Sequence, residues 1–195
     1  MPALHLLVGS NGAGKTTFFE QVLGPATHLP FINADLIARR QWPGDEEAHG
    51  HDAAALAEKA RNAAIVKKRS FIAETVFSHP SKIDLIRRAR DAGYLVFLHV
   101  MLVPEELTVF RTRLRAEQGG HSVPEQKVRE RYRRLWTNVE EAIQLCDEAT
   151  VYDNSAARQP YRIAARYQNG QLLGEPAFPA WSPLTVVRRK PRARP

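Results

Sequence analysis

Residues 9–16 read GSNGAGKT and satisfy the pattern GxxxxGK[ST]. Glycines let successive backbone N–H groups turn inward around an anion, and the start of a helix adds the positive end of its dipole. A lysine in such a loop reaches the β and γ phosphates, and the next hydroxyl can bind Mg²⁺. We therefore predict a nucleoside triphosphate site, with Lys15 catalytic and Thr16 a metal ligand. The predicted contacts are Gly9, Ser10, Asn11, Gly12, Ala13, Gly14, Lys15, Thr16 and Thr17.

Two acidic residues follow the next two predicted strands. Asp35 comes after the strand 29–33, and Glu74 ends the strand within residues 70–77, directly before Thr75. Ligands of an open parallel sheet bind at the carboxyl ends of its strands, so both acids should emerge beside the phosphates. Other interpretations are an N-cap role for Asp35 and polar groups at 74 and 75 that are satisfied within the fold.

Arginines are concentrated in residues 111–134, around a Gly-Gly-His sequence at 119–121. An arginine placed over a γ phosphate stabilises charge on the transferred group. We expect two or three of these basic residues to touch phosphate and His121 to order a hinge. The others, Arg111, Arg113, Arg133 and Arg134, are expected to be solvated or paired with Glu117, Glu125 or Glu130.

The elements that must position these residues alternate along the chain. Apolar strands are predicted at 3–8, 29–33, 70–77, 93–102 and 148–154, and helices at 14–24, 34–40, 45–69, 81–92, 104–117 and up to about 145. The first helix should end at Gly24, with Pro25 behind it. An Asn-Gly turn predicts a hairpin over 161–174. The pattern predicts an α/β fold of three layers, with a parallel sheet, an Arg-rich helical lid and a C-terminal hairpin.

The 195 residues, 44% of them hydrophobic, suit one domain, which we predict over 1–175. Five of the seven excess positive charges follow residue 175, so 176–195 is predicted to be a basic, disordered tail, with nucleic-acid binding the less favoured interpretation. The apolar run 95–103 is too short to span a membrane. No signal peptide is evident, and the single cysteine, Cys146, suits a cytoplasmic protein and a buried structural thiol.

Three classes of phosphate-loop protein are compatible with residues 9–16. An ABC-type ATPase would show an apolar strand ending in Asp or Asp-Glu and a signature motif, and a GTPase would show NKxD; neither occurs in the sequence. Acids after the second and third strands and a late Arg-rich segment favour a kinase that acts on a small hydroxyl-bearing acceptor, using ATP and Mg²⁺.

Six motifs occur in the order and at approximately the spacing of the zeta toxin family of P-loop kinases, which the chain resembles from residue 4 to 155. They are GSNGAGKTT, INADLIA, FIAETVFS, GGHSVPEQKVRERY, TNV and VYDNS. The resemblance is strongest to the compact bacterial branch described as predicted ABC-type ATPases. It implies a nucleotide-kinase-like fold, ATP-dependent phosphorylation, and an antitoxin as a possible partner. In characterised zeta toxins the acceptor is a sugar hydroxyl of UDP-N-acetylglucosamine.

The resemblance also implies roles for single residues. Asp35 falls where the family has its general base, and Glu74 and Thr75 match its acceptor site. Arg115, Arg129 and Arg131 match arginines of the family's lid, and Arg115 is expected to contact the acceptor, with Arg129 and Arg131 catalytic. Asn154 is expected either near the adenine or in an Asx turn. The toxin branch has one residue between acid and hydroxyl, whereas Glu74 and Thr75 are adjacent. Two alternatives stay open: a kinase of another nucleotide or sugar derivative, and a non-catalytic ATP-binding module with a tail that docks nucleic acid.

Overall fold

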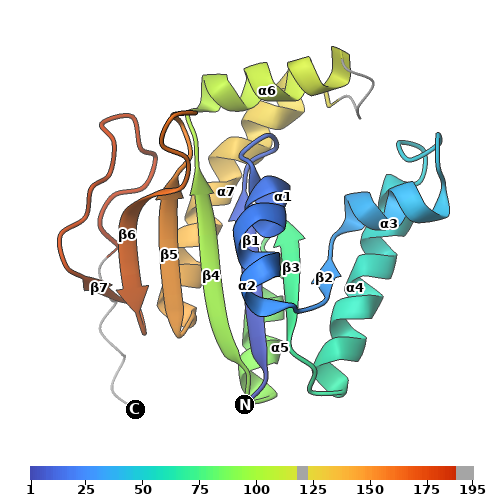
Figure 1. The fold of residues 1–195 in the computed structure, drawn as a ribbon, viewed down its shortest axis with the longest axis horizontal. Coiled ribbons are helices and arrows are strands. Elements are labelled where there is room, and N and C mark those ends of the chain that lie inside the picture. Colours follow the sequence, from blue (N-terminus) through green and yellow to red (C-terminus); the bar gives the residue numbers. More distant parts are fainter. Residues whose placement is uncertain (118–122, 188–195) are drawn as a thin grey trace.

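The computed structural model describes residues 1–117 and 123–187. A sheet in the order β2-β3-β1-β4-β5-β6-β7 forms its centre (Figure 1). The first five strands of the chain run parallel, and β6 and β7 are antiparallel. The predicted α/β fold with a C-terminal hairpin is confirmed, although the hairpin extends the sheet and makes it mixed. The strands are β1 (Ala3–Gly9), β2 (Phe31–Ile32), β3 (Phe71–Thr75), β4 (Leu95–Leu102), β5 (Glu148–Asp153), β6 (Arg162–Gln168) and β7 (Gln171–Leu173).

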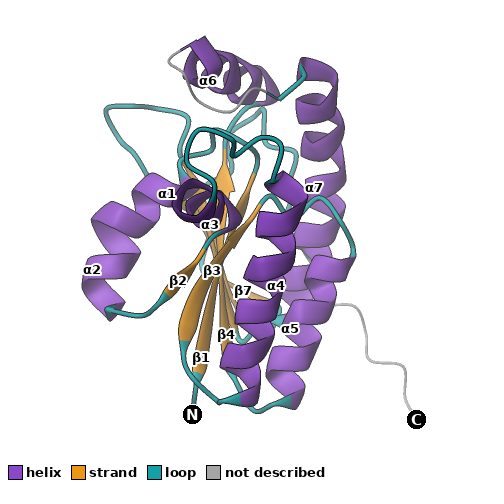
Figure 2. Cartoon of the chain, turned by 90° about the vertical axis from the view of Figure 1, so that its right-hand side faces the viewer, coloured by secondary structure: helices purple, strands orange, loops and turns teal. Residues whose placement is uncertain are grey.

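Helices cover both faces of the sheet, as Figure 2 shows from the side. The first face carries α1 (Lys15–Phe18), the π-helical turn η1 (Phe19–Leu23) and α2 (Gly24–Thr27). The second carries α4 (Gly50–Val66), α5 (Ser81–Asp91) and α7 (Glu125–Leu145). At the carboxyl ends of the parallel strands, α6 (Glu105–Glu117) lies across the sheet, and α3 (Ala34–Gln41) packs against α4 (Figure 1).

The parallel strands are apolar on both sides because both sides are covered. Successive strand residues point to opposite faces. Leu6 of β1 accordingly belongs to the cluster beneath α5 and α7, whereas Leu7 packs with Phe18 of α1. Cys146 is buried in the larger cluster, and burial raises the pKa of its thiol. It is therefore a structural, inert thiol, as predicted.

The first helical segment does not end at Gly24, in contrast to the prediction. The Gly24 N–H donates to the carbonyl of Phe19, five residues earlier, which widens the turn. Pro25 has no N–H to donate, and a proline is tolerated in the first turn of the new helix segment α2. The segment ends at His28, whose φ of 55° lies in the left-handed region.

The helix predicted over 45–69 is shorter in the structure. It begins at Gly50, and its Leu56 is 40% exposed although it is the one leucine of the helix. Arg61 is instead buried, with 7% of its surface exposed. The helix thus turns a charged side chain, rather than an extra leucine, toward the interior.

The segment 176–187 is ordered against the sheet, which corrects the predicted start of the tail. Leu184 is buried, and the Val187 N–H donates to the Tyr167 hydroxyl at 3.3 Å. Apolar contacts therefore hold residues that the concentration of positive charge after residue 175 had assigned to a tail. The five basic residues, Arg188, Arg189, Lys190, Arg192 and Arg194, lie outside the described residues, as does His121. No described helix is long and apolar enough to cross a membrane.

Candidate active site

The phosphate-binding loop joins the end of β1 to the start of α1, as its sequence predicts. Lys15 is almost fully buried, and its Nζ donates to the carbonyls of Gly9 at 3.1 Å and Ser10 at 2.9 Å. The side chain therefore folds back over the loop. Two residues outside the loop also bond to it. The Thr108 and Ser10 hydroxyls form a hydrogen bond of 2.8 Å, and Asn154 Nδ2 donates to the Ala13 carbonyl at 2.9 Å. The loop is thus fixed to α6 and to the end of β5.

The phosphate-binding loop is tightly packed at Gly14. Its φ is 88°, and a Cβ there would lie 2.4 Å from Asn154 Nδ2. Gly44 has a φ of 87° with nothing within 4 Å of its Cβ position, so Gly44→Ala measures the cost of the backbone conformation without a steric clash.

We expect Gly44→Ala to cost about 1 kcal/mol of unfolding free energy. Gly14→Ala should cost at least about 2 kcal/mol and weaken ATP binding more than about tenfold. Denaturant unfolding and calorimetry measure both; equal losses in the two variants would contradict the packing described.

Glu74 connects the loop to the neighbouring strands. Its Oε1 lies 3.7 Å from Lys15 Nζ, and its Oε2 accepts from the Thr16 hydroxyl at 2.9 Å and from Asn33 Nδ2 at 2.8 Å. Burial lowers the pKa of Lys15, and the Glu74 charge opposes that shift. One carboxylate therefore holds the lysine, the hydroxyl and an amide in a fixed arrangement.

Asn33 has a role that the sequence analysis did not assign. Its Oδ1 accepts from the Leu36 N–H at 3.0 Å, so Asn33 is the N-cap of α3. The N-cap interpretation of Asp35 is therefore wrong. Asp35 lies in the first turn of α3, with its side chain at a pocket. The Asn-Ala-Asp spacing before an apolar run carried this signal, because asparagine is a preferred N-cap.

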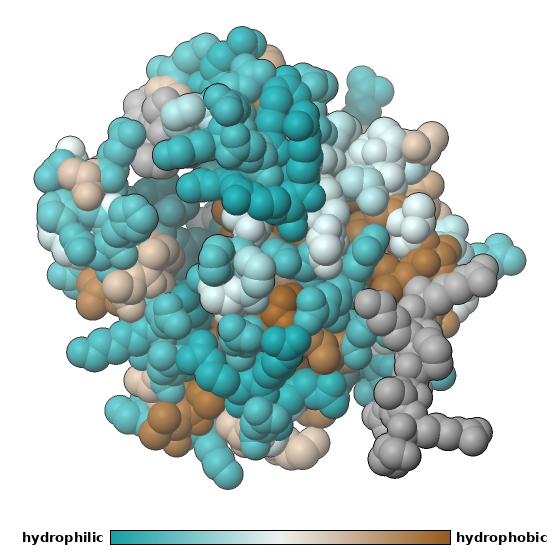
Figure 3. All heavy atoms as spheres, turned by 180° about the vertical axis from the view of Figure 1, so that it is seen from behind, coloured by the Kyte–Doolittle hydropathy of each residue, from teal (hydrophilic) through white to brown (hydrophobic). Residues whose placement is uncertain are grey.

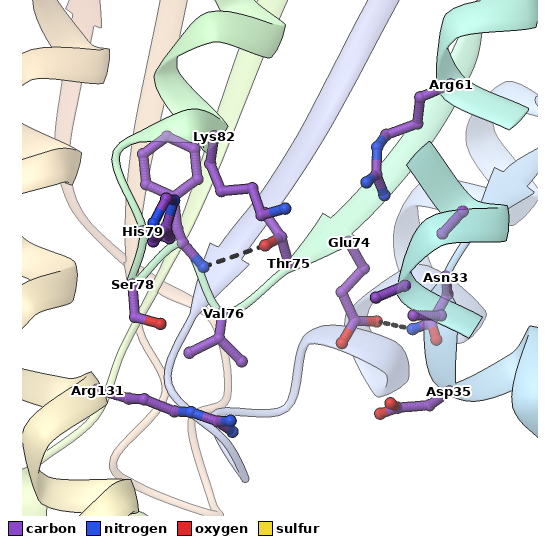
Figure 4. Close-up of a pocket in the computed structure, with 14 residues that line it drawn as sticks. Asn33, Asp35, Arg61, Glu74, Thr75, Val76, Ser78, His79, Lys82 and Arg131 are labelled. Carbon is purple, nitrogen blue, oxygen red and sulfur yellow. Dashed lines mark hydrogen bonds between the residues drawn. The ribbon is translucent and has the colours of Figure 1, made fainter. Parts of the chain in front are cut away.

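A pocket of about 260 Å³ lies between α3, α4, β3, the start of α5 and α7. Because Glu74 and Thr75, the residues predicted at the acceptor site, line it, we refer to it as the acceptor pocket. Asp35 and Arg131 approach it from one side in the view of Figure 4, and Glu74 and Thr75 form part of its wall. Seen from behind, the molecule is hollowed between the α3–α4 side and the α6–α7 side (Figure 3). The remaining lining residues are Asn33, Ala34, Ala54, Ala57, Arg61, Val76, Phe77, Ser78, His79 and Lys82.

One wall of the acceptor pocket is a strained loop held by α7. Phe77 has a φ of 63°, and its carbonyl accepts from Asn138 Nδ2 at 2.8 Å. Its N–H donates to the Thr75 hydroxyl at 3.2 Å. Asn138 belongs to the TNV motif, for which the sequence analysis gave no separate role. Such strain persists only where surrounding contacts impose it.

A second pocket, of about 320 Å³, lies on the other side of the phosphate-binding loop. Arg115, predicted at the acceptor site, lines this second pocket instead. Arg111 is not paired with a glutamate, as had been expected; its guanidinium donates to the Gly12 and Asn154 carbonyls at 3.3–3.4 Å. Apolar and aromatic groups beside arginines suit a nucleobase. The lining residues are Gly12, Gly14, Thr17, Arg111, Leu114, Arg115, Asn154 and Tyr161.

Arg129 and Arg131 point in different directions. Side chains two positions apart in a helix point about 200° away from each other, so only one of these two arginines can face the pocket. Arg131 lines the acceptor pocket. Arg129 forms ion pairs with Glu105 at 3.4 Å, Glu106 at 2.6 Å and Glu125 at 2.9 Å, and these carboxylates raise its pKa. Arg129 therefore joins α7 to α6 and lines neither pocket.

Thr16 and Glu74 are the residues that suit Mg²⁺ at the loop. The described residues contain no cluster of three or more His, Cys, Asp or Glu side chains that could hold a metal. Mg²⁺ does not require one, because it usually keeps several waters and binds through one or two carboxylates and the substrate phosphates. A hydroxyl and a carboxylate oxygen 2.9 Å apart fit that chemistry.

Solved structures with low sequence identity share this fold. The PezAT toxin–antitoxin system of Streptococcus pneumoniae gives a TM-score of 0.59 at 18% identity, over 78% of this chain and 68% of that one. A gluconokinase from Sinorhizobium meliloti gives 0.53 at 17% identity, over 82% and 85%. AvrRxo1-ORF1:-ORF2 solved with ATP gives 0.69 at 16% identity, over 90% of this chain but only 61% of that one. The chain thus has the fold of P-loop kinases.

The chain belongs to the zeta toxin family, whose model matches residues 1–165. No curated protein matches the chain.

Proposed function

We propose that the chain transfers the γ-phosphate of ATP to a hydroxyl of a small molecule bound in the acceptor pocket. The observation that carries this proposal is the position of Glu74. Its carboxylate contacts Lys15 and Thr16 of the loop and also lines the acceptor pocket beside Asp35. A phosphate held by the loop and a hydroxyl held in the pocket would therefore meet at this carboxylate.

Each group of residues has a separate role in the proposed reaction. The loop N–H groups and Lys15 bind the β and γ phosphates, and the second pocket takes the nucleobase. Asp35 accepts the proton of the acceptor hydroxyl as the phosphoryl group departs. Arg131 stabilises negative charge on the transferred group. Thr16 and Glu74 would hold Mg²⁺, which neutralises phosphate charge when bound.

UDP-N-acetylglucosamine is the acceptor proposed first, because it is the acceptor of characterised members of the family. The adjacent Glu74 and Thr75 depart from the toxin spacing and favour a second candidate, another nucleotide or sugar derivative. The PezAT structure comes from a toxin–antitoxin system, and AvrRxo1-ORF1 was solved with AvrRxo1-ORF2, which supports an antitoxin-like protein as a partner.

Radiolabelled ATP incubated with a panel of acceptors, led by UDP-N-acetylglucosamine, tests this function. We expect label to appear in at least one nucleotide sugar or sugar derivative. Slow ATP hydrolysis that no acceptor changes, together with binding of nucleic acid through residues 188–195, would instead support the non-catalytic module.

Arg131→Met and Arg129→Met form a matched pair. Since Arg131 faces the acceptor pocket, its loss should lower kcat about 10²-fold with less than about a threefold change in ATP affinity. Arg129→Met should lower the melting temperature, because it leaves Glu106 without its partner and Glu105 with Arg133 alone, and change kcat less than about threefold. Steady-state kinetics and thermal unfolding measure both. The reverse pattern would assign the catalytic arginine to position 129.

A further inference from the structure

Arg61 and Lys82 enter the acceptor pocket from two different helices. Arg61 comes from α4, and Lys82 comes from the first turn of α5. In the view of Figure 4 both point toward the region above Glu74 and Thr75, whereas Asp35 and Arg131 lie below them. The proposed function assigns roles to Asp35 and Arg131 but none to Arg61 and Lys82.

Neither basic side chain has an anionic partner in the described part of the chain. Arg61 is 7% exposed, yet no hydrogen bond or ion pair links it to a described residue. Glu58 favours its charge from a distance, but the carboxylate of Glu58 pairs with Arg88 at 3.8 Å. Burial lowers the pKa of Lys82, and the nearby positive charge of Arg61 lowers it further. Two like charges therefore line the same pocket, Arg61 with little exposed surface and Lys82 half-buried.

Such an arrangement is costly unless an anion completes it. A guanidinium with little exposed surface and no ion pair loses hydration, and the distant charge of Glu58 returns only part of that free energy. Glu74 cannot supply the missing charge, because its oxygens already serve Lys15, Thr16 and Asn33. The planar fork of an arginine beside a lysine matches a phosphate group, which offers several acceptor oxygens.

We propose that Arg61 and Lys82 form an anion subsite that holds a phosphate group of the acceptor while a hydroxyl of the same molecule faces Asp35. This inference rests on the proposed kinase function and narrows its substrate class. The acceptor is a phosphorylated sugar or a nucleotide sugar, and neutral sugars are poor substrates.

Phosphate binding tests the subsite without any turnover. With a non-hydrolysable ATP analogue filling the loop, inorganic phosphate is titrated into the wild type, Arg61→Met, Lys82→Met and the control Lys59→Met, an exposed lysine on α4. We expect the Kd for phosphate to rise about tenfold or more in the first two variants and to stay unchanged in the control. Failure of the wild type to bind phosphate, or equal affinities in Arg61→Met and the wild type, would overturn the subsite.

Thermal unfolding separates this role from a structural one. Without phosphate, Arg61→Met should melt at the wild-type temperature or higher, because methionine fills the space without a buried charge. A lower melting temperature together with unchanged phosphate affinity would assign Arg61 to the fold instead.

Acceptor kinetics distinguish failure of the subsite from failure of the kinase proposal. Matched acceptors with and without a phosphate, such as N-acetylglucosamine 1-phosphate and N-acetylglucosamine, are compared in the wild type and Arg61→Met. We expect Arg61→Met to raise KM about 10- to 100-fold for the phosphorylated acceptor only. Equal use of both acceptors by the wild type would overturn the subsite and leave the kinase intact. Phosphate binding at Arg61 without transfer to any acceptor would leave the subsite intact and overturn the kinase proposal.

Discussion

Lys15→Met is expected to lower phosphoryl transfer about 10³-fold or more. Methionine keeps the length of the side chain and removes the charge that meets the β and γ phosphates, where charge develops during transfer. Because Lys15 is buried and bonded to the Gly9 and Ser10 carbonyls, we expect ATP affinity to fall as well. Transfer rates at saturating ATP and calorimetric titration with ATP measure the two effects separately.

Lys59→Met is the matched control for this substitution. Lys59 is exposed on α4 and lines neither pocket, so its loss should leave both transfer and ATP affinity unchanged. Removal of Lys15 also takes a cation from beside Glu74, and thermal unfolding shows whether the variant is folded. A folded Lys15→Met protein that transfers phosphate at the wild-type rate would mean that the loop is not the phosphate site.

Asp35→Asn is expected to lower phosphoryl transfer by about 10² to 10⁴, the range typical of general acid–base catalysis. Asparagine keeps the size of the side chain but cannot accept the proton of the acceptor hydroxyl. The loop and Lys15 are untouched, so ATP affinity should change less than about tenfold. Because Asn33 caps α3, the melting temperature should stay close to that of the wild type.

Asp52→Asn provides the corresponding control. Asp52 lies in the first turn of α4, as Asp35 lies in the first turn of α3, so both changes remove a carboxylate from a helix N-terminus. Only the change at 35 should affect transfer. Near-normal transfer by Asp35→Asn would rule out Asp35 as the base, and an equal loss in both variants would point to helix stability.

The phosphate-binding loop could be predicted because its chemistry is local. Residues 9–16 carry the glycines, the lysine and the hydroxyl in one continuous stretch, between a strand and a helix that their own patterns predict. The order of the elements and the three layers could also be predicted, because apolar strands alternate with helices along the chain. The hairpin over 161–174 followed from its Asn-Gly turn.

The parts that could not be predicted depend on contacts between distant segments. Arg129 and Arg131 look alike in the sequence, and only the packing of α7 against α6 turns Arg129 to Glu106 and Arg131 to the pocket. Arg61 follows the buried Ala53 and Ala57 at intervals of four, so it lies on the same face of α4, but the sequence gives no sign that this face stays buried at a charged residue. The helix that continues past Gly24 required the wide turn at Phe19, a backbone adjustment that residue patterns do not encode.

Single-turnover transfer is the most direct test that the acceptor pocket receives the γ-phosphate of ATP. Radiolabelled ATP is bound to the wild-type protein, then mixed with UDP-N-acetylglucosamine or the best acceptor of the panel, and the label is followed in the acceptor and in free phosphate. We predict that the label enters the acceptor faster than it appears as free phosphate. Release of all the label as free phosphate, at a rate that no acceptor in the panel changes, would contradict the kinase function.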